Sequence, residues 1–101
     1  MSAAYEASFD SFLENLAGEG IVVGGGAGGG KIYVSRTTRC GHLEIDSALS
    51  AVQLALADKD GVEEGPNTDT VSEDFEYRYD SCHFSQLGWD EVAGLWLEKL
   101  T

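Results

Sequence analysis

This chain has 101 residues, 43% of them apolar and 10% aromatic, and it carries 18 acidic against 6 basic side chains. The length allows a single domain, and the apolar content is too high for a disordered chain. A net charge of −12 argues against nucleic-acid binding, which needs clustered cations to neutralise phosphates. The sequence has neither the apolar run of a transmembrane helix nor the features of a signal peptide, so we expect no membrane contact and leave the compartment open.

The N-terminal 17 residues are predicted to form a helix, because apolar side chains recur at three- and four-residue spacings. That stripe consists of Tyr5, Phe9, Phe12, Leu13 and Leu16. Gly18 and Gly20 follow it, where a helix often ends. The β-branched run 21–23 predicts the start of a strand. The glycine-rich segment 24–30 predicts a mobile loop, since glycine is costly to order.

Residues 31–35, Lys-Ile-Tyr-Val-Ser, predict a strand. A second helix is predicted from about residue 44 to residue 57, with an apolar face formed by Ile45, Leu49, Val52 and Leu56. The segment 58–76 contains eight acids and the only proline. This composition predicts an acidic loop, with one short strand near Val62.

The last helix is predicted from about Ser85 or Leu87 to Leu100, with an apolar stripe that includes Val92 and Trp96. Helices that alternate with short strands predict an α/β fold with a short parallel sheet and helical cover. No repeat or boundary divides residues 1–101, so we expect one domain. One or two strands do not make a self-sufficient sheet, so a partner chain or more of this chain is expected to complete it.

Two loop motifs resemble ligand sites but depart from them. Residues 25–31 fit the G-x-x-x-x-G-K start of a phosphate-binding loop, yet Ile32 stands where Ser or Thr is required, and a strand is predicted where a helix should follow. Residues 58–61, Asp-Lys-Asp-Gly, resemble the opening of a calcium loop, but the glycine comes at the fourth position and no third ligand is in register. A flexible loop and a solvated acidic face are the favoured interpretations, and no cofactor is expected.

The two cysteines, Cys40 and Cys82, lie 42 residues apart, and each has a histidine nearby, His42 and His83. Two Cys and two His can bind zinc in principle. However, the spacing lacks the C-x₂₋₄-C turn that is common in structural zinc sites. A disulfide or two free thiols is the favoured interpretation, and no metal site is expected.

Asp80 and His83 are the candidate catalytic residues, because an imidazole titrating near neutral pH can move a proton during catalysis. A carboxylate three residues earlier in a loop can fold back onto Nδ1–H of the ring, which fixes the tautomer and leaves Nε2 for a nucleophile. An Asp-x-x-His spacing is weak evidence when taken alone, since a histidine before a helix is usually a surface or capping residue.

The stretch from about Tyr33 to the C-terminus resembles the end of an SGNH-type (GDSL-like) hydrolase. More narrowly, it resembles the sialate O-acetylesterase-like carbohydrate esterases. The matching segments follow in order: Tyr33-Val34-Ser35 with Thr38-Arg39-Cys40, the pair Val52-Gln53, Gly65-Pro66-Asn67-Thr68-Asp69, and the block from Arg78 to Gly88 that contains Asp80, Cys82 and His83.

The resemblance implies a flavodoxin-like three-layer α/β/α fold, of which this chain would be the C-terminal portion. It implies an orienting role for Asp80 and the role of general base for His83 in hydrolysis of O-acetyl or similar esters of carbohydrates. It also implies that the turn at Cys40 and the loop at Cys82 meet at the carboxyl edge of the sheet. We therefore expect contact between these cysteines, close enough for a disulfide.

The chain departs from the family because it lacks the Gly-Asp-Ser nucleophile block and both oxyanion-hole blocks. We therefore expect a partial esterase domain that is inactive alone and needs a serine-bearing partner. Ser35 and Ser81 are weaker candidates for the nucleophile. Ser81 lies between the acid and the base in the sequence, where the geometry for attack is poor. The alternative is a non-catalytic acidic interaction module that self-associates through its apolar helix faces.

Overall fold

The computed structural model describes residues 2–26, 28–40, 45–72, 74 and 76–101. The element order is α1 (Ser2–Gly18), β1 (Ile32–Arg36), α2 (Ser47–Ala55), η1 (Leu56–Asp58), β2 (Val62–Asn67), η2 (Thr68–Thr70) and α3 (Gln86–Leu100), where η1 and η2 are single 3₁₀ turns.

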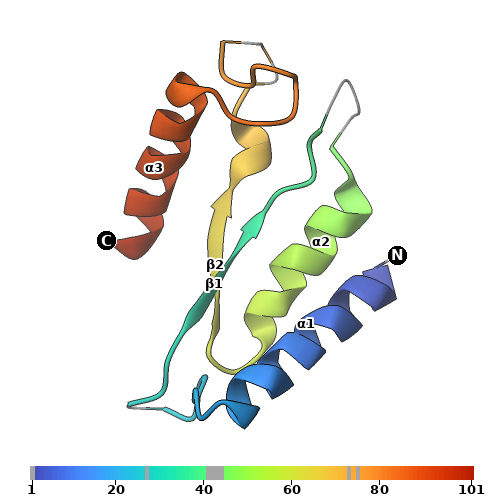
Figure 1. Ribbon diagram of the computed structural model, residues 1–101, viewed down its shortest axis with the longest axis vertical. Coiled ribbons are helices and arrows are strands. Elements are labelled where there is room, and N and C mark those ends of the chain that lie inside the picture. The colour runs from blue at the N-terminus through green and yellow to red at the C-terminus, as the bar shows by residue number, and fades with distance from the viewer. Residues whose placement is uncertain (1, 27, 41–44, 73, 75) are drawn as a thin grey trace.

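The two strands form a parallel sheet that lies between helices (Figure 1). Helix α2 connects β1 to β2 and packs against β1, with α1 beyond it. Helix α3 covers the other side of the sheet, where the ring of Trp96 meets that of Tyr33 edge-on at 6.3 Å. The predicted α/β class with a short parallel sheet is therefore confirmed.

Side-chain caps explain where α2 and α3 begin. The Leu49 N–H donates to the Asp46 carboxylate at 2.9 Å, and the Gly88 N–H donates to the Ser85 hydroxyl at 3.2 Å. Helix α2 thus begins after Asp46, later than predicted, and it ends in η1. Residue 44, where the predicted helix starts, lies outside the described residues.

The short strand predicted near Val62 in the acidic segment 58–76 is confirmed as the six-residue strand β2, and the turn η2 follows it. A register shift between Val34 and Arg36 places one extra residue in β2, near Pro66. Proline has no N–H to donate, and a bulge is where a strand tolerates it. The neighbouring Gly65 is required by close packing, since a Cβ there would lie 2.9 Å from the carbonyl carbon of Val34.

The prediction of a strand at residues 21–23 is wrong, because in this segment only Val23 forms a bridge, to Gly30. The described glycines between them turn the chain back on itself, and the Gly24 N–H donates to the Gly30 carbonyl at 2.9 Å. The Asp60 carboxylate ties this turn to the start of β2 by accepting from the Gly25 N–H at 2.9 Å.

The apolar core is small for a chain of this length. Among the described residues, the buried apolar side chains are Leu56, Val62, Val71 and Val92. The accessible surface is 6441 Å², against roughly 5,500 Å² for a compact protein of this mass. The radius of gyration is 15.1 Å, against about 13 Å for a compact domain of 100 residues. No described helix is long and apolar enough to cross a membrane.

We predict that Leu56→Ala lowers the free energy of unfolding by about 2–3 kcal/mol, because it leaves a cavity between η1 and the sheet. Leu97→Ala is the matched control, since Leu97 is 64% exposed, and it should change the free energy by less than about 0.5 kcal/mol. Urea denaturation monitored by tryptophan fluorescence measures both. Equal losses would show that Leu56 is not part of the core.

Candidate active site at the carboxyl ends of the strands

The candidate site lies on a tight loop beyond the carboxyl end of β2. An antiparallel bridge between Arg78 and Phe84 closes this loop. At its tip, Ser81 has a φ of +64°, a left-handed conformation that non-glycine residues rarely adopt, and its N–H donates to the Arg78 carbonyl at 3.0 Å. The loop is therefore a closed turn that holds residues 79–83 in a defined arrangement.

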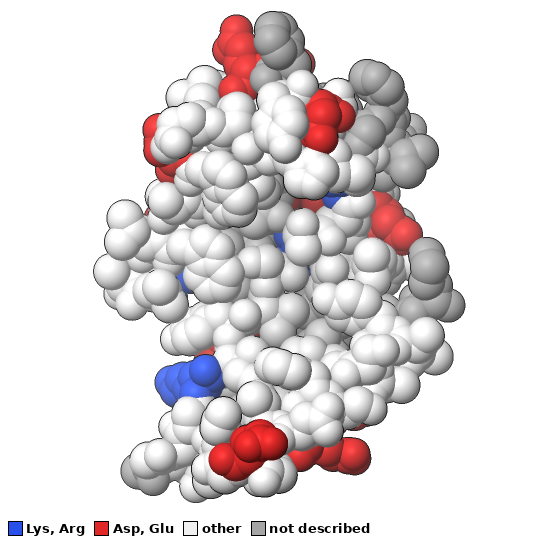
Figure 2. Space-filling view, viewed as in Figure 1, with Lys and Arg blue, Asp and Glu red and all other residues white. Residues whose placement is uncertain are grey.

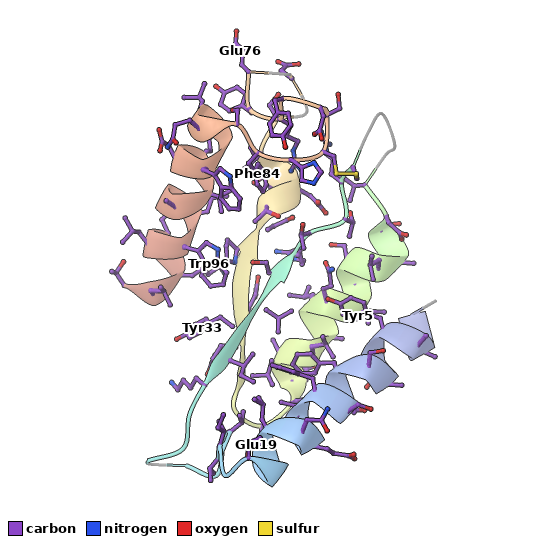
Figure 3. The ribbon with its side chains drawn as sticks, in the orientation of Figure 1. Tyr5, Glu19, Tyr33, Glu76, Phe84 and Trp96 are labelled. Carbon is purple, nitrogen blue, oxygen red and sulfur yellow. A yellow bond between two sulfur atoms is a disulfide. The ribbon has the colours of Figure 1, made fainter. Side chains whose placement is uncertain are left out.

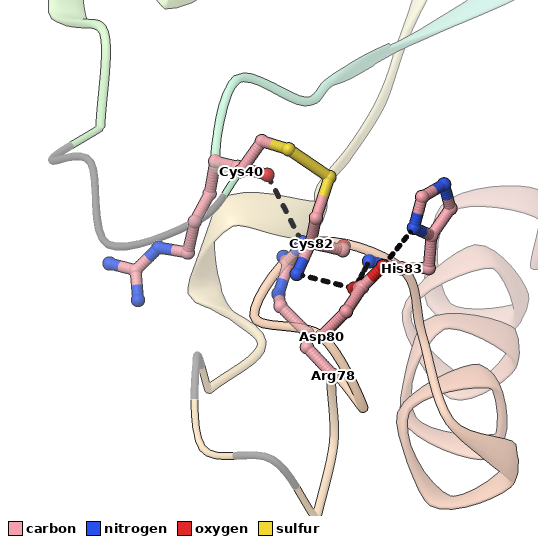
Figure 4. A network of polar contacts seen from close by, with 6 residues as sticks. Cys40, Arg78, Asp80, Cys82 and His83 are labelled. Atoms are coloured by element: carbon pink, nitrogen blue, oxygen red, sulfur yellow. Dashed lines mark hydrogen bonds and ion pairs between the residues drawn. A yellow bond between two sulfur atoms is a disulfide. The ribbon is translucent and has the colours of Figure 1, made fainter.

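The structure brings Asp80 and His83 together (Figure 4). Oδ2 of Asp80 lies 2.6 Å from Nδ1 of His83, and Oδ1 accepts the N–H groups of Cys82 and His83 at 2.9 and 2.6 Å. The carboxylate therefore organises the turn and orients the ring at the same time. The His83 side chain is 68% exposed, so the pair lies at the surface.

The charge state of Asp80 follows from these bonds. The hydrogen bond with the His83 ring, aided by the N–H donors of His83 and Cys82, lowers the pKa of Asp80 from 3.8 to about 2. An ionised Asp80 accepts a hydrogen bond from Nδ1–H, which leaves Nε2 as the site that can take a proton from a nucleophile. Among the described residues, no serine hydroxyl forms a hydrogen bond with this imidazole.

A buried cation anchors the loop from behind. Arg78 is only 2% exposed, and its guanidinium donates to the carbonyls of Thr68, Cys82 and Arg39 at 2.9, 3.0 and 3.3 Å. It also lies over the Phe84 ring, 4.4 Å from the centroid. Burial, together with the charge of Arg39, lowers the pKa of Arg78. One side chain thus joins the exit of β1, the turn η2 and the site loop.

Asp69 makes a second connection behind the site. Its carboxylate accepts the N–H and hydroxyl of Thr38, at 2.8 and 2.7 Å, and the N–H of Arg39, at 2.9 Å. Burial acts to raise the pKa of Asp69, but these hydrogen bonds outweigh it and the pKa lies below its usual value. Gln53 of α2 is also buried and clamps Thr37, accepting its N–H at 2.8 Å and donating to its carbonyl at 3.1 Å.

The sequence alone predicts no role for Arg78 or Asp69. Arg78 is the one Lys or Arg between Lys59 and the last helix, and Asp69 closely follows the strand near Val62. Those sequence positions are the features that could have drawn attention to Arg78 and Asp69. Without the fold, neither signal identifies the carbonyl and amide groups that the side chains bind.

The structure joins Cys40 and Cys82, the cysteines expected to be in contact, in a disulfide with a Cα–Cα distance of 4.1 Å. The bond links the exit of β1 directly to the site loop. Their sulfur atoms are bonded to each other, which removes both as zinc ligands. His42, the third residue of that hypothesis, lies outside the described residues.

The two loop motifs have local structures that differ from those of the ligand sites they resemble. Lys31 leads into β1 instead of a helix, and it pairs with Glu63 at 3.8 Å. Lys59, which separates the two acids of the calcium-like segment in the sequence, pairs with Glu6 and Asp10 of α1, at 3.2 and 3.1 Å. The described residues contain no cluster of acids, histidines and cysteines that could hold a metal ion.

We predict that His83→Ala raises the pKa of Asp80 from about 2 toward 3.8, because the largest cause of the depression is the bond to the ring. A lowered folded-state pKa means that ionised Asp80 stabilises the turn above pH 3.8 and loses this effect as the pH falls toward 2. Carboxyl ¹³C NMR titration measures the change.

Lys99→Gln is the matched control, since it removes a charge that pairs with Glu64, away from the site loop. It should leave the pKa of Asp80 unchanged. A low pKa of Asp80 that persists in His83→Ala would contradict the geometry.

Comparison of the chain with models of known protein families, with curated proteins and with solved structures finds no match.

Proposed function

We propose that this chain supplies the acid–base half of a serine ester hydrolase, with His83 as general base and Asp80 as the residue that orients it. The observation that carries the proposal is the 2.6 Å contact between Nδ1 of His83 and the Asp80 carboxylate, on an exposed loop beyond the carboxyl ends of parallel strands. In open α/β sheets, ligands bind at that edge.

The proposed reaction needs a serine from another chain or another segment. Nε2 of His83 takes the proton of that serine hydroxyl as its oxygen attacks the acyl carbon, and Asp80 stabilises the imidazolium. The imidazolium then returns the proton to the departing alkoxide, which leaves as an alcohol and forms an acyl-serine. Water, deprotonated by the same imidazole, attacks this ester and releases the carboxylic acid and the serine.

The resemblance to sialate O-acetylesterase-like enzymes makes short acyl esters of carbohydrates the proposed substrates. It also makes the two strands part of a larger flavodoxin-like sheet. The arrangement of α1 and α2 on one side of the sheet and α3 on the other supports this extension, as does the accessible surface in excess of that of a compact domain.

The first test measures the reactivity of His83 in the isolated chain, where no serine partner is needed. Diethyl pyrocarbonate acylates neutral imidazole nitrogen, and mass spectrometry locates the adduct. We expect Asp80→Asn to slow the modification of His83 several-fold, because an amide no longer holds the ring with Nδ1 as donor. Asp90→Asn is the matched control, since Asp90 lies on α3 and bonds to Gln86. Equal rates in wild type and Asp80→Asn would contradict the proposal.

A fluorophosphonate probe and an aryl-acetate assay complete this test. The wild-type chain should give neither an adduct nor hydrolysis above the level of His83→Ala. A stoichiometric adduct that requires His83 would show that the nucleophile lies within these 101 residues. The half-site proposal would then be wrong.

A second candidate function, a self-associating interaction module, is favoured by the exposed apolar surface. Leu97, Leu100 and Trp89 on α3 are 64%, 57% and 55% exposed. Figure 2 shows one face whose centre is largely uncharged, with acidic side chains gathered toward its ends. The surface in excess of a compact domain, about 900 Å², is similar to the area that one partner buries in a standard interface.

If this second candidate is correct, the chain is a dimer at about 100 μM, well above the Kd of a specific interface, and Leu97→Glu converts it to a monomer. Glu98→Gln is the matched control, because it alters the adjacent position without placing a charge in the apolar stripe. Sedimentation velocity measures both. A wild-type monomer at this concentration would contradict self-association and leave the half-site proposal in place.

A further inference from the structure

The loop that carries His83 has an inner and an outer layer of side chains. The bridge between Arg78 and Phe84 pairs the two arms of the loop, and successive side chains on paired arms point to opposite sides. Arg78 and Phe84 therefore share the inner side, where the guanidinium lies on the ring. Tyr79 and His83 share the outer side, where their rings are stacked with centroids 5.8 Å apart and an interplanar angle of 17°.

Tyr79 has little other support for its ring, since it is 62% exposed. Its backbone, in contrast, is firmly placed between the buried Arg78 and the hydrogen-bonded Asp80. A near-parallel ring pair at this separation is attractive. The position of Tyr79 thus follows from the inner layer, and its ring stacks on the imidazole with an offset.

A single hydrogen bond leaves an exposed imidazole free to pivot about the Nδ1–carboxylate contact. Asp80 forms a hydrogen bond at the Nδ1 edge of the ring, and Tyr79 stacks on its face. Together these two contacts restrict the pivot. The remaining edge, which carries Nε2, faces away from Asp80 (Figure 4).

We infer that Tyr79 is a positioning residue, whose ring stacks on His83 and, together with Asp80, holds Nε2 outward for the incoming nucleophile. The assignment of His83 as a base rests on the proposed function, but the stacking contact itself does not. The aromatic ring carries this role, and the phenolic hydroxyl is not required for it.

The test compares Tyr79→Leu with Tyr79→Phe in the full chain. Tyr79→Leu should raise the pKa of Asp80 from about 2 part of the way toward 3.8, because a pivoting ring weakens the bond that lowers it. It should also slow the reaction of His83 with diethyl pyrocarbonate severalfold. Tyr79→Phe should preserve the low pKa of Asp80, the reaction rate and the nuclear Overhauser contact between the two rings.

Tyr77→Leu is the matched control, because Tyr77 is a tyrosine of the same segment whose ring does not stack on His83 in the described residues. Amide spectra check that each variant is folded. The inference is overturned if Tyr79→Leu behaves like wild type, if Tyr79→Phe is as impaired as Tyr79→Leu, or if Tyr77→Leu has the same effects.

Failure of this inference is distinguishable from failure of the proposed function. If Asp80→Asn leaves the reactivity of His83 unchanged, the acid–base proposal fails, whereas the ring contact and the pKa of Asp80 still test the role of Tyr79. If Tyr79→Leu alone behaves like wild type, the role of Tyr79 is overturned, whereas the acid–base pair is unaffected.

Discussion

The arrangement of the site depends on the buried guanidinium of Arg78. A cation removed from water is costly unless it is hydrogen-bonded, and here the two terminal nitrogens of Arg78 donate to the carbonyls of Thr68, Cys82 and Arg39. Those three groups belong to segments that are far apart in the sequence. Moving any one of them would leave a buried N–H of the guanidinium without its acceptor, so these contacts favour the arrangement in which the segments meet.

The arrangement of the exposed side chains of the site follows from that buried contact. Arg78 and Phe84 occupy the inner side of the loop, so Tyr79 and His83 emerge together on the outer side. Asp80, between them, bonds both the turn and the ring. A surface histidine in a flexible loop can adopt many rotamers. The buried Arg78 fixes the backbone of this loop, and Asp80 then holds the ring. The position of the proposed base, His83, thus depends on the buried contacts of Arg78 beneath the loop.

Polar contacts and a disulfide, drawn as a yellow bond in Figure 3, supplement a small apolar core. Asp69 and Gln53 hold the exit of β1, and the disulfide joins this exit to the site loop across 42 residues of chain. Closing a loop of that length removes chain entropy worth about 4 kcal/mol from the unfolded state. That amount is comparable to the burial of two large aliphatic side chains, so the carboxyl edge of the sheet is stabilised largely by these connections.

The sequence by itself determined the helices, the α/β class and the contact between Asp80 and His83, because each depends on residues close together in the chain. Periodicity of three and four residues defines α1, α2 and α3, and the Asp-x-x-His spacing allows Asp80 to reach His83 within one turn. The tertiary structure alone decided the length of β2, the burial of Arg78 and the bonds of Asp69. These features depend on partners 10 to 39 residues away, whose meeting is set by packing and not by any local pattern.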